Sequence, residues 1–267
     1  MDPASRIQLH SGNQMPIMGL GTWQLTDDTQ QAVSTAMDLG YRMIDTSGDY
    51  GTQAAIGEAI RASNLDRDEI YIVTKVEETD DAYAATRNNL NELGLDYANL
   101  ILIHRPPKHG AGEELWRGLV RAREEGLSRD IGVSNYSIEL IEELIEATGE
   151  LPAVNQVEWS PFGHDLDLKQ HADFSGIVIQ AYSPLTRATR LDDAGLLEIA
   201  EKYDRTPAQV MIRWNLQRGT VPIPKANQRR HLEENIAVFD FALDEDDLDA
   251  LDSLNEHFSS LGRLPYV

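Results

Sequence analysis

The chain has 267 residues and a formal net charge of −22, from 23 basic and 45 acidic residues. Hydrophobic residues make up 41% of it, which predicts a globular rather than a disordered protein. No apolar run approaches the ~20 residues that span a bilayer, and the acidic excess argues against nucleic-acid binding. Because the chain has no cysteine, disulfides and thiolate chemistry are excluded.

The N-terminus and the charge pattern bear on where the protein works. The first residues, MDPASRIQLH, have neither the basic nor the apolar segment of a secretory signal, so a cytoplasmic protein is expected. Acidic residues are spread through helical segments, which costs self-repulsion unless salt screens it. At ~1 M salt the Debye length falls to about 3 Å. The composition therefore favours a salt-rich cytoplasm, with an ordinary acidic enzyme as the alternative.

Short apolar runs rich in β-branched residues recur along the chain, and each predicts a strand. They occupy residues 16–21, 41–45, 70–75, 100–104, 130–135, 153–158, 176–182 and 220–225. Amphipathic helical segments separate them, and most runs begin roughly 24 to 30 residues apart, the size of one βα unit. The runs are apolar throughout, as in a parallel sheet covered on both faces. Eight such units predict an α/β protein with a (β/α)8 barrel, a fold of about 250 residues.

Other segments lie outside these units. The turn signal SGN between two extended runs predicts an N-terminal β-hairpin, placed to close the bottom of the barrel. Two helical segments, not one, separate the seventh and eighth strands, and residues 244–254 predict a final helix. Since no linker or low-complexity segment interrupts the chain, residues 1–267 are expected to form one barrel domain.

The C-terminal strand ends are where a barrel of this kind places its chemistry. Asp45 ends the second strand and Tyr50 follows it, Lys75 ends the third strand, and His104 ends the fourth. Each residue alone has an ordinary explanation, such as a helix cap, a packing tyrosine or a solvated charge. The barrel brings all four to one rim, and no common structural need places these types together.

The chemistry of the four side chains fits together. A tyrosine has a pKa of ~10, and a nearby ammonium such as that of Lys75 lowers it. Asp45 would hold the lysine in place, and His104 would orient the substrate oxygen. Tyr50 would then protonate an alkoxide as it forms. The seven histidines lack ligand spacings such as HExxH, so no metal is expected.

The sequence resembles the aldo-keto reductase family over nearly its whole length. The motifs that carry the resemblance are GLGTW (19–23), DTSGDYG (45–51), TK (74–75), LIHRP (102–106), GVSN (132–135), NQVEWSP (155–161), AYSPL (181–185), TPAQVMIRW (206–214) and IPKANQRRHLEEN (223–235). The resemblance implies NAD(P)H-dependent reduction of an aldehyde or ketone. It makes Tyr50 the proton donor, tuned by Lys75 and Asp45, and makes His104 the residue that orients the carbonyl.

The resemblance also implies a nicotinamide cofactor, NADP(H) in preference to NAD(H). Ser134, Asn135 and Gln156 would hold the nicotinamide carboxamide, and Tyr182 would stack on the ring. The segment after the eighth strand would bind the adenosine 2′-phosphate. The further cofactor residues lie at the strand ends and in that segment: Gly21, Thr22, Asp45, Ser183, Leu185, Lys225, Ala226, His231, Glu234 and Asn235.

Some positions depart from the family pattern. Arg105 follows the fourth strand's histidine where tryptophan is usual, and Ala226 and His231 stand where NADP-specific members tend to carry serine and arginine. A bond to a charged group contributes ~1.5–3 kcal/mol, so losing a bidentate arginine would reduce the preference for NADPH roughly tenfold or more. Arg229 and Arg230 lie close enough in sequence to compensate. NAD(H) is therefore the alternative cofactor.

The expected substrate is a small carbonyl compound, and the expected assembly is a monomer or a weak oligomer. The residues expected around the substrate are Trp23, Tyr50, His104, Arg105 and Trp159, with the loop TRATR (186–190). Arg105, Arg187 and Arg190 favour a polar or anionic substrate, unless they are only surface charges.

Two interpretations from other classes stay open. One is a non-catalytic barrel that binds the cofactor as a sensor or channel-associated subunit, which has no need of Lys75 and His104. The other is an unrelated barrel enzyme such as a phosphosugar isomerase, whose glycine-rich phosphate loop is missing here.

Overall fold

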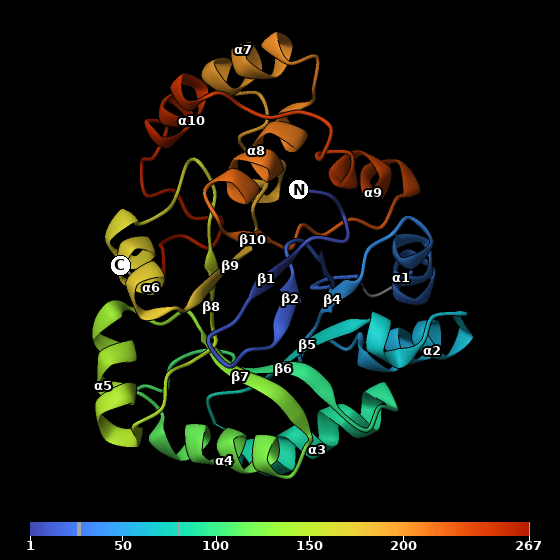
Figure 1. Ribbon diagram of the computed structural model, residues 1–267, viewed down its shortest axis with the longest axis vertical. Coiled ribbons are helices and arrows are strands. Elements are labelled where there is room, and N and C mark those ends of the chain that lie inside the picture. Colours follow the sequence, from blue (N-terminus) through green and yellow to red (C-terminus); the bar gives the residue numbers. More distant parts are fainter. Residues whose placement is uncertain (26–27, 80, 267) are drawn as a thin grey trace.

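A barrel of parallel strands forms the centre of the computed structural model, which describes residues 1–25, 28–79 and 81–266 (Figure 1). The strands pair in chain order: β3 (Leu20–Gly21), β4 (Met43–Asp45), β5 (Tyr71–Val76), β6 (Ala98–Ile103), β7 (Ser128–Ser134), β8 (Val154–Glu158), β9 (Val178–Tyr182) and β10 (Val221–Pro222). A parallel bridge between Gly21 and Lys225 closes the ring. The predicted (β/α)8 barrel is therefore confirmed; Val267, the last residue of the predicted domain, lies outside the described residues.

Closure of the ring depends on a glycine. The Gly21 amide donates to the Pro224 oxygen at 3.2 Å, and the Gly19 amide donates to the Pro222 oxygen at 3.0 Å. A Cβ at position 21 would lie 2.7 Å from the carbonyl oxygen of Ile223. Since no side chain fits at that distance, only glycine allows the first and last strands to meet here.

Helices cover the outside of the barrel (Figure 1). They are α1 (Thr29–Asp38), α2 (Gln53–Ala62), α3 (Ala82–Leu93), α4 (Glu113–Glu124), α5 (Ile138–Thr148), α6 (Leu166–Ser175), α7 (Ala194–Lys202), α8 (Pro207–Gln217), α9 (Arg229–Ile236) and α10 (Glu245–Asp252), with short 3-10 turns η1 (Arg67–Glu69) and η2 (Thr186–Ala188). The two helices between β9 and β10 and the final helix α10 were all predicted from the sequence. Among the described residues, none of these helices has the length and apolar character that crossing a membrane requires.

Local signals in the sequence set the helix ends. Asp81 caps α3 by accepting from the amide of Ala84, and Gly94 ends that helix in a left-handed conformation. Thr206 and Gln209 form a reciprocal capping box at the start of α8. These caps fix where each helix leaves the barrel and therefore where the neighbouring loops run.

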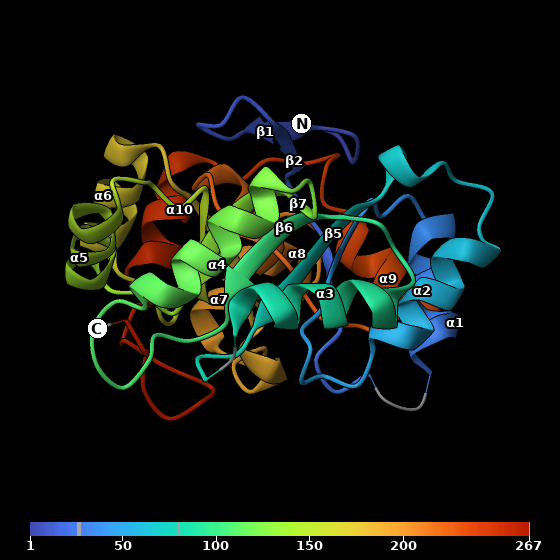
Figure 2. The same ribbon diagram turned by 90° about the horizontal axis from the view of Figure 1, so that it is seen from below.

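The N-terminal hairpin seals one end of the barrel. Its strands, β1 (Arg6–Gln8) and β2 (Gln14–Pro16), pair antiparallel, as predicted. Figure 2 shows the hairpin standing at one end of the barrel, while the C-terminal segment crosses the other end. Leu9 and Met15 pack into the apolar cluster inside the barrel. The hairpin therefore plugs the N-terminal end and leaves the C-terminal strand ends for the site.

Alternation along each strand decides which side chains face the barrel interior. On β5, Tyr71 and Val73 belong to the interior cluster, whereas Ile72 packs under the helices. The next interior position on this strand is Lys75. The same period of two brings Asp45 on β4 and His104 after β6 to the interior side of the rim.

Candidate active site

A cavity of about 560 Å³ opens at the C-terminal ends of the strands. Most of the residues predicted from the sequence line it: Gly21, Trp23, Asp45, Tyr50, His104, Arg105, Ser134, Asn135, Gln156, Tyr182, Ser183, Leu185, Lys225, His231, Glu234 and Asn235. They come from nearly every strand end and from α9. The barrel thus brings together in space what the sequence spreads over most of its length.

Three predicted residues lie behind the cavity wall. Lys75 is buried beneath Asp45, with 1% of its surface exposed. Thr22 is also buried, and its hydroxyl donates to the backbone oxygen of Asp45 at 2.8 Å. Ala226 packs in the apolar core between barrel and helices. These residues can support the site but do not line it.

Trp159 corrects the expected substrate pocket. This side chain is 2% exposed, stacks on Tyr266 and packs against His164. The C-terminal segment covers it, so it does not line the cavity. Leu261, from that same segment, lines the cavity instead. Sequence reasoning could not place this tail, because nothing local in the sequence shows which strand end it folds over.

The cavity has other lining residues that the sequence did not single out. They are Gln24, Pro184, Leu191, Ala208, Ile223, Pro224 and Leu261. A signal existed for Ile223 and Pro224, which directly precede the predicted Lys225 at the last strand end.

Asp45 and Lys75 form a buried ion pair at the base of the cavity. Lys75 Nζ donates to both carboxylate oxygens of Asp45 at 2.9 Å and to the backbone oxygen of Thr46 at 2.8 Å. The Gln156 amide also donates to Asp45, at 2.7 Å. Because every lysine proton has an acceptor, the ammonium is held in one position, 4.9 Å from the centre of the Tyr50 ring.

The pKa of Tyr50 is shifted in the direction opposite to the one expected from the sequence. Burial raises the pKa of Tyr50 well above its usual value, and the negative charges of Asp45 and Asp49 raise it further. Arg105 lowers it only in part. The net shift is opposite to the expected lowering, because burial and the two carboxylates outweigh the effect of the nearby cations. The Tyr50 hydroxyl therefore keeps its proton across the neutral range.

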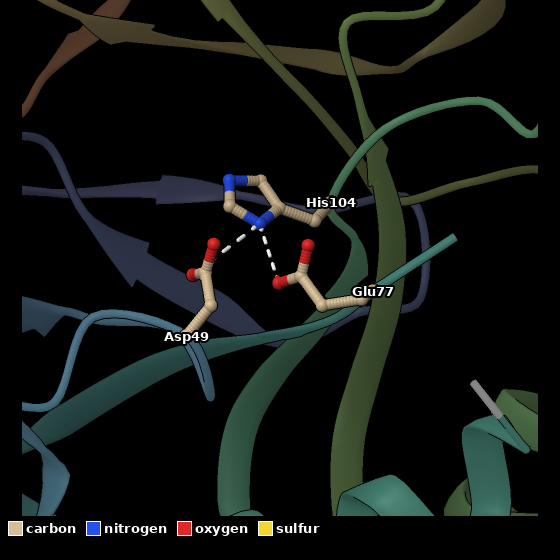
Figure 3. Close-up of side chains that lie close together, drawn as sticks. All are labelled: Asp49, Glu77 and His104. Atoms are coloured by element: carbon tan, nitrogen blue, oxygen red, sulfur yellow. Dashed lines mark hydrogen bonds and ion pairs between the residues drawn. The ribbon is translucent and has the colours of Figure 1, made fainter. Parts of the chain in front are cut away.

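His104 lies beside Tyr50 and is held by two carboxylates. The two rings meet edge-on, with centroids 5.7 Å apart. Figure 3 shows Glu77 and Asp49 directed at the same ring nitrogen, Nδ1, at 2.7 Å and 3.7 Å. The sequence did not single out Glu77, although it lies two residues beyond Lys75 and therefore on the same face of the β5 segment.

Asp49, Glu77 and His104 are also spaced closely enough to hold a metal ion. Among the described residues, their potential ligand atoms all lie within 4.8 Å of one another. The guanidinium of Arg105, however, lies 3.0 Å from Glu77 and 3.6 Å from Asp49. The arginine already supplies the positive charge that these carboxylates need, so we assign no metal to the group.

A polar network continues from the ion pair along β7 to β9. The Asn135 amide donates to the His104 backbone oxygen at 3.0 Å, and the Asn135 side-chain oxygen accepts from the Tyr182 hydroxyl at 2.8 Å. Ser134 donates to the Gln156 backbone oxygen at 2.7 Å. These bonds hold neutral amide and hydroxyl groups in the cavity wall beside the ring of Tyr182.

Comparison with known proteins agrees with this geometry. Residues 17–256 match the model of the Aldo/keto reductase family. The chain belongs to this family. An aldo-keto reductase of Mycobacterium tuberculosis is 41% identical over 259 residues, covering 95% of this chain and 92% of the relative.

Solved structures of other family members have the same fold. One from Brucella melitensis has a TM-score of 0.89 at 36% identity, covering 94% of this chain and 99% of that one. The Bombyx mori aldo-keto reductase, solved in complex with NADP, has a TM-score of 0.92 at 32% identity and covers 97% of this chain and 95% of that one. Membership of this family indicates an oxidoreductase, and it confirms the resemblance seen in the strand-end motifs.

The loop after β9 is strained. Ser183, Thr186, Arg187 and Ala188 all have positive φ angles, between 46° and 64°. Left-handed backbone in residues other than glycine costs energy and gathers at functional sites. The Arg187 guanidinium lies 4.3 Å from the centre of the Trp23 ring, and both side chains line the cavity.

The far end of the cavity is formed by α9. His231, Glu234 and Asn235 line it there, with Lys225 from the preceding loop. Arg230 contacts Nε2 of His231 at 3.0 Å. The other arginine considered from sequence, Arg229, instead pairs with Glu233 one turn further along the helix, at 2.7 Å.

Proposed function

We propose that this protein reduces an aldehyde or ketone to an alcohol, with Tyr50 as the proton donor. The observation that carries the proposal is the arrangement at the base of the cavity. A phenol that keeps its proton lies beside His104, over the buried Asp45–Lys75 pair. A carbonyl oxygen placed between the phenol and the imidazole would meet both groups.

NADP(H) is the cofactor that best fits the polar and charged groups of the cavity. Neutral amide and hydroxyl groups line the cavity near Tyr182, as a nicotinamide carboxamide requires, and Lys225, His231 and Arg230 lie at the other end. The Bombyx mori relative binds NADP, and another relative with 32% identity was solved with NADPH. When bound, the cofactor supplies the hydride. NAD(H) is the alternative, because His231 stands where NADP-specific members of the family tend to carry an arginine.

The side chains of the protein supply the proton that the substrate oxygen takes up. The Tyr50 hydroxyl and the His104 ring would meet the negative charge that develops on the carbonyl oxygen during reduction. The proton of Tyr50 moves to that oxygen and gives the alcohol. Lys75 then faces the phenolate that forms at Tyr50 and stabilises it until a proton returns from solvent.

The arginines near the cavity narrow the substrate class. Arg190 pairs with Glu256, and Arg105 pairs with Asp49, Glu77 and Glu78. Arg187, held over Trp23, is the cation best placed for a substrate carboxylate. We therefore favour a polar or anionic carbonyl compound, reduced in the cytoplasm by a monomer or weak oligomer.

A cofactor-oxidation assay tests the proposal against a non-catalytic binder. A panel of aldehydes and keto acids is offered with NADPH and with NADH, and absorbance at the cofactor's reduced band is followed. We expect turnover with wild type and none with Tyr50→Phe, while both bind cofactor. Tight cofactor binding without turnover on any substrate would favour the sensor or channel-associated subunit instead.

A further inference from the structure

The Glu77 carboxylate links His104 to its surroundings. Oxygen Oε1 lies 2.7 Å from His104 Nδ1 and 3.1 Å from the Ser47 hydroxyl, which donates to it. Oxygen Oε2 accepts from Arg105 at 3.0 Å. Figure 3 shows that the other ring nitrogen of His104, Nε2, points away from Glu77. Nε2 is therefore the nitrogen left for the cavity that His104 lines.

Glu77 is an acceptor rather than a donor. Burial acts to raise the pKa of this carboxyl, but the hydrogen bond and charge of His104 and the charge of Arg105 outweigh burial and hold the pKa below its usual value. An ionised carboxylate has no proton to give. The 2.7 Å contact with Nδ1 therefore requires that Nδ1 carries the hydrogen.

The position of this proton limits what the ring can do at the substrate. A neutral imidazole with its hydrogen on Nδ1 has only a lone pair on Nε2, so it accepts hydrogen bonds there. A lone pair facing a carbonyl oxygen repels it and gives no stabilisation as negative charge develops. Only the imidazolium carries hydrogens on both nitrogens, one for Glu77 and one for the substrate.

We propose that Glu77 is a positioning residue that holds His104 as an imidazolium, with Nδ1–H bonded to the glutamate and Nε2–H presented to the substrate carbonyl. The inference rests on the proposed carbonyl reduction. The imidazolium keeps its proton throughout, because Tyr50 supplies the one that the alkoxide takes. His104 then stabilises the developing negative charge with a full positive charge.

The charged groups around His104 favour this state. Those that face it come from the loop after β4, from the end of β5 and from its own strand: Asp49, Tyr50, Glu77 and Arg105. The two carboxylates face Nδ1, and Arg105 is turned onto those carboxylates. Lys75 lies beyond the Tyr50 ring and is neutralised by Asp45.

A matched pair of variants tests the role of Glu77. Glu77→Gln removes the charge at Nδ1. Glu78→Gln removes a charge from the adjacent residue, which also pairs with Arg105, at 3.4 Å. Because the negative charge at Nδ1 favours the imidazolium, the alkaline limb of the kcat/KM–pH profile for reduction should move to lower pH by about one unit in Glu77→Gln, which lowers kcat/KM about tenfold above it. Glu78→Gln should keep the wild-type profile.

A second measurement needs no turnover. Long-range ¹H–¹⁵N NMR of wild type reports the protonation of the seven histidines, with His104 assigned through His104→Gln. We expect both ring nitrogens of His104 to be protonated at the pH of maximal activity. A neutral ring, with hydrogen on either nitrogen alone, would overturn the inference, as would identical pH profiles for Glu77→Gln and Glu78→Gln. Absence of turnover in wild type would count against the proposed carbonyl reduction. The NMR result would still show whether His104 carries the Nδ1 hydrogen that it shares with Glu77.

Discussion

The base of the cavity and its far end are held in different ways. At the base, Asp45, Lys75 and Gln156 are buried, and each bonds to groups from another strand. At the far end, Arg230 and Lys225 are exposed, and His231 on α9 contacts its sequence neighbour. Chemistry needs groups fixed to a fraction of an ångström, whereas an anionic cofactor group needs only charge of the right sign nearby. We therefore expect substitutions at the base to abolish function and substitutions at the far end to tune it.

Tyr50→Phe should have the largest effect. It removes the only atom of the tyrosine that gives a proton and leaves the ring beside His104, so turnover should fall by about 10²–10⁴ or more. Cofactor dissociation constants should stay within about twofold of wild type. Activity retained within about tenfold of wild type would show that another group supplies the proton.

Lys75→Met should damage both activity and stability. Asp45 would be left buried without its cation, and breaking a buried pair in this way costs about 3–5 kcal/mol. The free energy of unfolding from urea titration measures this loss. Lys225→Met is the control, because that lysine lies on the same rim but is exposed and should cost less than about 0.5 kcal/mol. Equal losses of unfolding free energy in the two variants would show that the base of the cavity is no more tightly held than its far end.

The sequence predicts the barrel well because each strand and helix is determined locally. The apolar runs at 70–75 and 100–104 need both faces covered, and their ends place Lys75 and His104 on one rim whatever the loops do. The seam was not predicted, because the close approach of Ile223 that leaves no room for a side chain at Gly21 exists only in the fold.

What the sequence did not predict depends on contacts across the fold. Trp159 follows β8 in a motif typical of the family, but the tail residue Tyr266 covers it, and tail position is not a local property. Glu77 was not singled out, because its partner His104 is far along the chain. The raised pKa of Tyr50 results from burial and from the carboxylates of Asp45 and Asp49, which an argument about Lys75 alone misses.

His231→Arg should change cofactor preference moderately. A guanidinium at this position would grip the 2′-phosphate that NADPH has and NADH lacks, so NADPH should bind tighter by about 1–3 kcal/mol while NADH barely changes. Isothermal titration with both cofactors measures the difference. Arg229→Gln serves as the control, since that arginine is paired with Glu233. If the dissociation constants of both cofactors change equally, or neither changes, then the 2′-phosphate is bound elsewhere than on α9.

Salt should have the smallest and most uniform effect on stability. It should act on the exposed surface charges and leave the buried pair at the base of the cavity unchanged. Raising KCl from about 0.1 M to about 1 M shortens the Debye length from about 10 Å to about 3 Å, which relieves repulsion among surface carboxylates but screens a buried pair much less. The net charge of −22 therefore predicts that Tm rises by several degrees, at roughly 2–4 °C for each kcal/mol. Lys75→Met should gain the same increment as wild type, because its defect lies in the buried pair and salt cannot repair it. Scanning calorimetry of both proteins across this range tests the argument. A flat Tm would leave the acidic composition without this explanation, and a larger gain in Lys75→Met would mean that the base of the cavity is open to salt.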